Sequence, residues 1–204
     1  LFKSFKQFPV EFFHYLAQLG DLSGDGLNSL ALIGPKSVRV YANLRETGFA
    51  PGKDVPHTPD RLPLFSGAGN ELVSFSDMGA SGMELCRIRH DEIRCWISLG
   101  HGRFGEGFKM SDLPFKYGEF DPDRVRIADV DNSGAPALIY LYSDFFEIWL
   151  NHGGNSLASE PVRIPWPRGV RYDNLCQVTF ADLRGIGCAS LLLTVLLLAV
   201  LLLA

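Results

Sequence analysis

The segment Ala128-Asp129-Val130-Asp131-Asn132-Ser133-Gly134 occurs in four versions along this chain. Each version reads small residue, Asp, apolar residue, two or three small or polar residues, then Gly; the other three are residues 20–26, 76–82 and 181–187. Their aspartates stand 56, 52 and 53 residues apart, at Asp21, Asp77, Asp129 and Asp182. Chance does not keep four such loops in register. The spacing therefore predicts a repeated structural unit of about 53 residues.

The residues after each of the first three loops predict a β-hairpin. After the third loop, for example, two runs rich in aromatic and β-branched residues, 138–142 and 145–151, flank the polar pair Ser143-Asp144. Such a pattern is typical of two strands joined by a tight turn. A large aromatic residue recurs 19 or 20 positions after the loop aspartate, as Tyr41, Trp96 and Trp149. We interpret these three residues as core wedges in equivalent positions of successive units.

Glycine-rich turns end the predicted hairpins. They are Gly48-Phe49, Gly100-His101-Gly102-Arg103-Phe104-Gly105 and residues 151–157. Glycine adopts positive φ without a steric penalty, so the chain can turn sharply here and return an apolar residue to the core.

A loop, a hairpin, a glycine-rich turn and further strands add up to one blade of four short strands. We therefore predict an all-β fold for residues 1–195: a partial β-propeller of about three and a half four-stranded blades with integrin-like Asp/Gly loops. Its units start near residues 21, 77, 129 and 182. Such a fragment cannot close a ring of the usual size, and open strand edges are a liability. We therefore expect the intact protein to continue beyond both ends.

The last nine residues, 196–204, form a Leu-rich tail whose status the repeat does not explain. The apolar stretch from Ala189 to Ala204 has 16 positions. A membrane-spanning helix needs about 20 such residues. We therefore do not expect a membrane span.

The acidic loops resemble the Asp-x-Asp-x-Asp-Gly cation loops of integrin-type blades. Calcium prefers six to eight oxygen ligands, with acids at alternating positions and glycine at the bend. Calcium is therefore the one candidate cofactor, in weak sites formed by Asp21, Ser23 and Asp25 and by Asp129, Asp131 and Ser133. The second loop keeps only Asp77 and Ser81, and the fourth keeps only Asp182. The alternative is structural, because one aspartate can accept hydrogen bonds from the amides of its own turn without any metal.

Charge and motifs argue against two functional classes. The formal net charge is −4, whereas nucleic-acid binding usually needs a basic surface. The chain contains no GxSxG, Walker or Cys–His signature, and its one stretch dense in glycine follows a predicted strand without opening a helix. We therefore expect a protein that is not an enzyme, with no catalytic residues.

The four cysteines are Cys86, Cys95, Cys176 and Cys188, and none forms a CxxC pair. Free cysteine behaves as a small buried hydrophobe. We therefore expect four buried free thiols, with one disulfide pair as the alternative.

Several motifs carry a resemblance to a known family. They include Phe8-Pro9-Val10-Glu11-Phe12-Phe13-His14, Glu147-Ile148-Trp149-Leu150-Asn151 and residues 30–43, 100–105 and 169–177. These segments are similar to the middle/N-terminal (TcdB-like) region of the TcB-type component of insecticidal toxin complexes. That component carries an FG-GAP/VCBS integrin-like β-propeller beside an SpvB-like region. The resemblance covers residues 8 to about 195.

The resemblance implies a role in virulence. The propeller would dock onto a TcA-type pore-forming subunit and gate toxin release, while a TcC-type partner would complete a shell around the toxic polypeptide. The complex would be secreted or extracellular, after a cytoplasmic stage, and would bind no nucleic acid; membrane contact by this segment is not expected. The alternative function is a calcium-dependent adhesion or carbohydrate-binding integrin-like propeller.

Overall fold

The computed structural model describes residues 17–57, 62–63, 70–80, 82–172 and 176–195. Within these ranges the regular structure is β-strand, apart from two short 3₁₀ helices, η2 (Arg45–Thr47) and η3 (Pro122–Arg124). The all-β prediction is therefore confirmed. The Leu-rich tail and residues 8–14 lie outside the described residues, so the predictions on them stay predictions.

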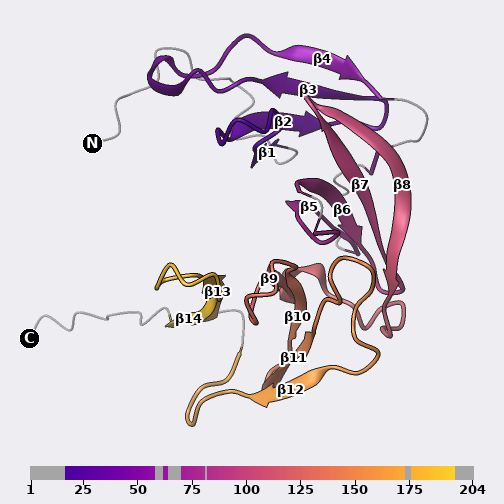
Figure 1. Cartoon of the computed structure of the whole chain (residues 1–204). Helices are drawn as coiled ribbons and strands as arrows, with labels where there is room; N and C mark the ends of the chain where they lie inside the picture. The colour runs from indigo at the N-terminus through magenta and orange to yellow at the C-terminus, as the bar shows by residue number, and fades with distance from the viewer. Residues whose placement is uncertain (1–16, 58–61, 64–69, 81, 173–175, 196–204) are drawn as a thin grey trace, which may run out of the picture. The chain divides into compact units, whose positions relative to one another are not determined.

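The strands form four antiparallel sheets (Figure 1). The first has the order β1-β2-β3-β4, and its strands are Ala17–Gly20, Ser29–Ile33, Ser37–Tyr41 and Lys53–Pro56. The second has the order β5-β6-β7-β8, with strands Leu72–Ser76, Glu84–Ile88, Glu92–Gly100 and Arg103–Asp112. The third has the order β12-β11-β10-β9; from β9 to β12 its strands are Val125–Ala128, Ala137–Leu141, Phe145–Trp149 and Val162–Pro165. In the fourth, β13 (Cys176–Ala181) pairs with β14 (Ser190–Val195), a strand that the sequence places after the fourth loop.

The chain divides into two compact units. One holds the first two sheets, up to Asp123, together with Gly154–Ser156, and the other holds Arg124–Gly153 and the chain from Leu157 onward.

Burial within a sheet explains why these residues form these strands. All five residues of the inner strand β10 are buried, whereas the outer strand β12 is exposed at three of its four positions. The outer strand β4 repeats that pattern and, like β12, ends in a proline. Charged residues and proline on an outer strand hinder pairing with foreign strands.

The recurring aromatic residues occupy equivalent positions, as predicted. Tyr41, Trp96 and Trp149 each stand opposite a leucine of the preceding strand, in the pairs Leu30↔Tyr41, Leu85↔Trp96 and Leu138↔Trp149. Their exposed fractions are 7%, 2% and 3%. In the first two sheets a glycine lies against the ring. A Cβ on Gly107 of β8 would stand 2.5 Å from Trp96 Nε1, and one on Gly52, just before β4, would stand 2.7 Å from the Tyr41 ring. The core interpretation of these aromatics is confirmed.

The glycine-rich turns also act as predicted. Each returns a buried apolar residue to pair with the chain just after the aromatic, in Asn43↔Phe49, Ser98↔Phe104 and Asn151↔Leu157. In the first unit the turn at Gly100–Gly102 packs on the first loop, where the His101 amide donates to the Leu22 carbonyl at 2.5 Å. A Cβ on Gly102 would lie 2.4 Å from Val40, so only glycine fits there.

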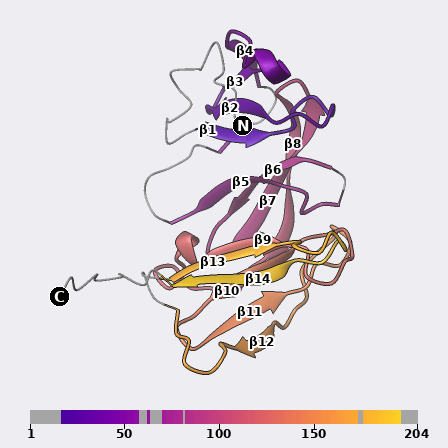
Figure 2. The same cartoon turned by 90° about the vertical axis from the view of Figure 1, so that its left-hand side faces the viewer.

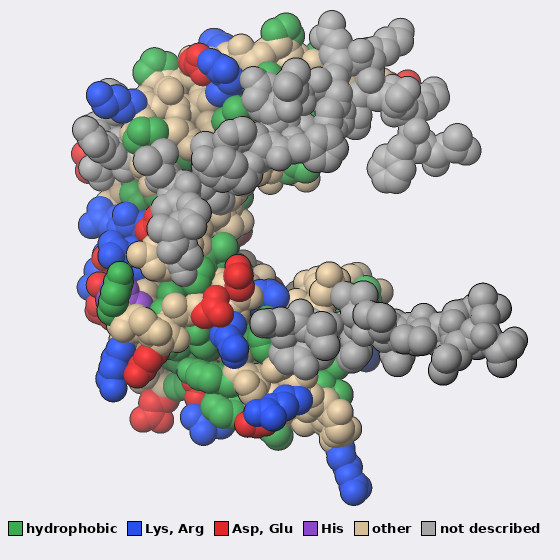
Figure 3. Space-filling model, turned by 180° about the vertical axis from the view of Figure 1, so that it is seen from behind, with side chains coloured by type: hydrophobic (Ala, Val, Ile, Leu, Met, Phe, Trp, Pro, Cys, Tyr) green, Lys and Arg blue, Asp and Glu red, His purple; other side chains and the backbone are tan. Residues whose placement is uncertain are grey.

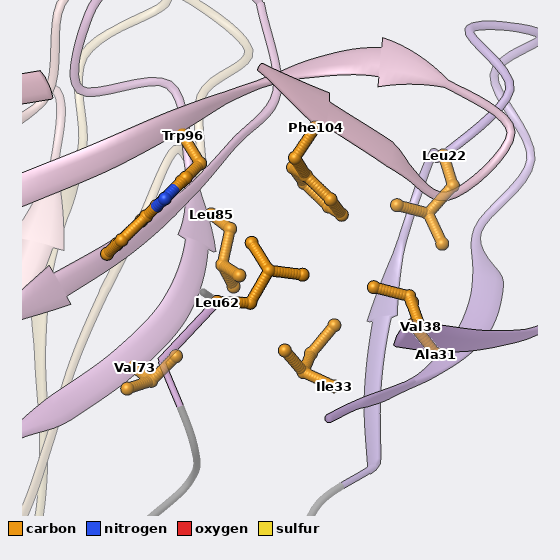
Figure 4. Packing of buried hydrophobic residues seen from close by; sticks show 9 residues of the cluster. All are labelled: Leu22, Ala31, Ile33, Val38, Leu62, Val73, Leu85, Trp96 and Phe104. Atoms are coloured by element: carbon orange, nitrogen blue, oxygen red, sulfur yellow. The ribbon is translucent and has the colours of Figure 1, made fainter. Parts of the chain in front are cut away.

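The core of the first unit lies between its two sheets (Figure 4). Ile33 and Val38 come from the first sheet, and Leu85 and Trp96 come from the second. Phe104 and Leu62 fill the space between the sheets, and all nine members of the cluster are at most 3% exposed.

The second unit builds its core in the same way. Ile139, Leu141 and Phe146 of the third sheet pack with Val178 of β13 and with Trp166. Figure 2 shows β13 beside β9, an edge strand of the third sheet.

In each unit a side-chain hydrogen bond joins the two neighbouring sheets, and it does so at equivalent positions. Gln18, three residues before Asp21, donates from Nε2 to the Val73 carbonyl of β5 at 2.6 Å. Arg126, three residues before Asp129, donates from Nε to the Val178 carbonyl of β13 at 2.8 Å. Each acceptor is four residues before its own loop aspartate. The repeat thus extends to side-chain contacts that join the first strands of neighbouring sheets.

The expectation of four free thiols is wrong. Cys86 and Cys95 are directly opposite each other on β6 and β7 and form a disulfide. The spacing hid this pair, because nine residues separate two cysteines that the hairpin register brings together. Cys188 is free and half-buried.

The surface carries charges of both signs. On the face drawn in Figure 3, acidic and basic side chains are interspersed. Over the described residues, no helix has the length and apolar character needed to cross a membrane.

Candidate functional site

The acidic loops occupy the same place in every sheet, between its first and second strands. The first loop joins β1 to β2, the second β5 to β6, the third β9 to β10 and the fourth β13 to β14. The structure therefore places Asp21, Ser23 and Asp25 in one loop, and Asp129, Asp131 and Ser133 in another.

In the first loop, three backbone amides donate hydrogen bonds to the carboxylate of Asp21. Gly24 and Asp25 donate their amides to Oδ1 at 2.8 and 3.2 Å, and Gly26 donates to Oδ2 at 2.8 Å. The Gly26 amide, followed by those of Gly24 and Asp25, holds the pKa of Asp21 below its ordinary value of 3.8 despite an opposing contribution from desolvation. Hydrogen bonds to the charged form of a carboxylate have this effect.

The third loop has the same arrangement around Asp129. Asp131 and Ser133 donate their amides to Oδ1 at 3.3 and 3.2 Å, and Gly134 donates to Oδ2 at 2.8 Å. The second acid, Asp131, also accepts from the Ser133 amide at 3.1 Å. Hydrogen bonding by the Ser133 side chain, then by its amide, lowers the pKa of Asp131.

The fourth loop repeats the arrangement with a single acid. Arg184 and Ile186 donate their amides to Asp182 Oδ1 at 3.2 and 3.1 Å, and Gly187 donates to Oδ2 at 2.7 Å. The Gly187 amide contributes most to the lowered pKa of Asp182.

The second loop differs, and a residue that sequence reasoning missed is central to it. Asp77 accepts from the Gly82 amide at 2.8 Å, while the Gly79 amide donates to Oε2 of Glu84 at 2.8 Å. Glu84 is fully buried. It pairs with Ser76, as Ser29 pairs with Gly20 and Ala137 with Ala128. The second loop is one residue shorter before this position, so an alignment that allowed for the gap would have found Glu84.

The hydrogen bonds of the leading aspartates bear on the choice between a structural role and a calcium site for these loops. In the first, third and fourth loops the leading aspartate uses both carboxylate oxygens to bind amides of its own turn, which supports the structural alternative. The same carboxylates could still contribute to a cation site, since each oxygen has more than one lone pair. Calcium binding by the first and third loops stays a prediction.

One cluster of potential metal ligands lies outside the predicted set. Among the described residues, Glu84, Cys86 and Cys95 form the one group of acid, histidine or cysteine side chains with three ligand atoms within 4.8 Å of one another. Both sulfurs are already joined in the disulfide.

A cavity of about 280 Å³ borders the first loop. Its lining is mostly apolar and includes Val40 and Val55, with Lys53 and His101 as its ionisable residues. No carboxylate is among the described residues that line it. The cavity thus lacks the paired carboxylates that many hydrolases use.

Comparison with known proteins found matches among solved structures only; no protein-family model and no curated protein matches the chain. A chain in a structure of the Photorhabdus luminescens Tc holotoxin pore is 45% identical, with a TM-score of 0.84; the match covers 93% of this chain and 9% of that one. A chain in the crystal structure of TcdB2-TccC3 is 43% identical over 91% of this chain and 9% of its own length, with a TM-score of 0.64. The corresponding chain of TcdB2-TccC3-Cdc42 is also 43% identical, with a TM-score of 0.63 and the same coverage.

A structure of an Agrocybe aegerita lectin, described as recognising non-reducing terminal N-acetylglucosamine, is more distant. It is 20% identical over 87% of this chain and 45% of that one, with a TM-score of 0.65. At this identity the match concerns the fold alone. The chain spans about a tenth of the length of the toxin-complex chains that it matches.

Proposed function

We infer that this chain is related to a segment of Tc toxin-complex chains, and from that premise we propose that it is a non-catalytic β-propeller segment of a TcB-type component. In this role it docks onto a TcA-type pore-forming subunit and gates the release of a toxic polypeptide. A TcC-type partner completes the shell. The complex acts outside the producing cell, after a cytoplasmic stage of assembly.

The observation that carries the proposal is the match to the holotoxin pore chain. The match has 45% identity and a TM-score of 0.84, and it covers 93% of the chain, which means that it extends into both units. Two repeated features support the finer proposal that the four sheets are successive propeller blades: the equivalent aromatic pairs, and the hydrogen bonds that join the first strands of neighbouring sheets. Blades repeat radially with the same contacts.

The gating part of the proposal rests on the same match, because the matched chain belongs to a structure of a Tc holotoxin pore.

The alternative, a calcium-dependent adhesion or carbohydrate-binding propeller, is not favoured. The lectin match supports the fold and gives no support for sugar binding. Weak calcium binding in the first and third loops would be compatible with either function.

Photo-crosslinking in the assembled complex tests the docking proposal. A photoreactive amino acid replaces one exposed residue at a time in the full-length protein, at Leu44, Leu99, Val162 and Leu183, whose exposed fractions range from 49% to 65%. Buried Leu138 serves as the control position for non-specific reaction. We expect at least one exposed position to crosslink to the pore-forming subunit. If the complex assembles and none of the four positions does so, the segment is not the docking surface.

A further inference from the structure

The disulfide of the second sheet lies in a fully enclosed place. Cys86 and Cys95 are both 0% exposed, and the register pairs them across β6 and β7. Their neighbours Leu85 and Trp96 belong to the core of the first unit. This bond therefore links two inner strands at the core, away from solvent.

A buried carboxylate stands next to the disulfide. Glu84 is two residues before Cys86 and thus on the same side of β6. Its side chain is 0% exposed, and Oε2 is 3.8 Å from Cys86 Sγ. The same oxygen accepts the Gly79 amide of the second loop at 2.8 Å. A burial of this kind is costly for a carboxylate, so Glu84 is a feature that apolar packing alone would not place here.

The oxidation state of the sulfurs changes what Glu84 contacts. In the disulfide, Cys86 Sγ has no proton to donate. In the reduced state its thiol can donate to Oε2, which is already within reach. A buried thiolate beside a buried carboxylate would place two negative charges together, so the thiol remains protonated. Glu84 therefore favours the dithiol state relative to a chain without the carboxylate.

We propose that Cys86, Cys95 and Glu84 form a redox site, in which a dithiol reductant opens the disulfide and Glu84 holds the proton of the Cys86 thiol. A thiolate of the reductant attacks one sulfur and forms a mixed disulfide. The second thiol of the reductant then attacks the reductant sulfur of the mixed disulfide, which releases the protein sulfur as a thiol and leaves an oxidised, cyclic reductant. Two electrons and two protons pass to Cys86 and Cys95, so the reaction is balanced.

Burial makes this site sensitive to opening of the sheet. An attacking thiolate must reach a sulfur in line, and neither sulfur is exposed while β6 and β7 are paired. Reduction thus follows local separation of these strands. Once reduced, the sheet loses a covalent link between two inner strands, and Glu84 gains a contact that competes with its bond to the second loop. The site does not depend on the proposed toxin role.

Thermal unfolding of the full chain, with and without dithiothreitol, tests the redox link. We expect the oxidised protein to melt several degrees higher, because the crosslink restricts the unfolded chain. The variant Cys86→Ala/Cys95→Ala should be insensitive to dithiothreitol, whereas Cys188→Ala should keep the full shift, because Cys188 takes no part in the disulfide. An unchanged melting temperature, or alkylation of both Cys86 and Cys95 after denaturation without reductant, would overturn the proposal.

A redox titration separates the role of Glu84 from simple packing. The fraction of disulfide is measured by alkylation and mass spectrometry against the ratio of reduced to oxidised dithiothreitol. In Glu84→Gln we expect about ten times more reduced dithiothreitol to be needed at the midpoint, the equivalent of one charge-assisted hydrogen bond. The variant Glu92→Gln, on the other inner strand, should leave the midpoint unchanged. Equal midpoints for Glu84→Gln and the wild type would show that Glu84 does not hold the proton.

Discussion

The third and fourth loops differ in acidity and agree in shape. The third has Asp129, Asp131 and Ser133, whereas the fourth has Asp182 with exposed Leu183 and Ile186 around it. Both leading aspartates nevertheless accept three amides, at 3.3, 3.2 and 2.8 Å in the third loop and at 3.2, 3.1 and 2.7 Å in the fourth. The carboxylate of one aspartate is thus enough to shape the loop, and the side chain of the further acid, Asp131, has no part in the shared set of bonds.

The largest effect should come from removing the leading aspartate of either loop. Asp129→Ala leaves three amides without their acceptor, and we expect a loss of about 2 kcal/mol in the free energy of unfolding. Asp182→Ala should act in the same direction. Urea unfolding of the full chain measures both. A large loss for Asp129→Ala with none for Asp182→Ala would mean that the two loops are not held alike.

The next largest effect tests whether the stability of the fourth sheet, β13-β14, depends on its hydrogen bond to the third sheet. Arg126→Ala removes the hydrogen bond from its Nε to the Val178 carbonyl, and we expect a loss of about 1 kcal/mol. Arg163→Ala is the matched control, since Arg163 pairs with Glu147 inside the third sheet. Hydrogen exchange should become faster at the β13 amides in Arg126→Ala only. Unchanged hydrogen exchange at the β13 amides would show that the Arg126 hydrogen bond does not hold β13 to the third sheet.

Acid should weaken the fourth loop through the lowered pKa of Asp182. Hydrogen bonds led by the Gly187 amide depress the pKa of Asp182 in the folded protein. A depressed folded pKa adds stability above the unfolded pKa, near 3.8, and this stability is lost as the pH falls through the folded pKa. The stability difference between the wild type and Asp182→Asn should therefore be constant above about pH 5 and shrink below pH 4. A difference that grows toward low pH would contradict this assignment.

Calcium should have the smallest effect and should distinguish the loops. Only the first and third loops offer a second acid, so millimolar Ca²⁺ should raise the melting temperature by a degree or two at most, about what weak binding provides. Asp25→Asn/Asp131→Asn should abolish that shift, whereas Asp182→Asn should not. Melting that is the same in Ca²⁺ and in EDTA would exclude the calcium prediction.

The features that repeat could be predicted from the sequence. A fixed spacing of Asp, aromatic and glycine residues reports directly on equivalent positions, so the hairpins, the Tyr41, Trp96 and Trp149 pairs and the returning turns all followed from it. Four sheets with almost no helix confirm the all-β class.

What departs from the repeat could not be predicted in this way. Glu84 is shifted by a loop that is one residue shorter, and the Cys86–Cys95 bond depends on a strand register that spacing alone does not give. Gln18 and Arg126 stand at equivalent positions and donate to equivalent backbone carbonyls of the neighbouring sheet. They are different residue types, so no residue pattern identifies them. Each of these contacts joins residues through the register of strands, which only the folded chain defines.

An experimental structure of the full-length protein bound to its pore-forming subunit is the most direct test of the proposed docking propeller. We expect these four sheets to stand side by side as successive blades at the contact with that subunit, with Tyr41, Trp96 and Trp149 in equivalent places. A structure in which the segment lies away from the pore-forming subunit, or in which the three aromatics occupy unlike positions, would contradict it.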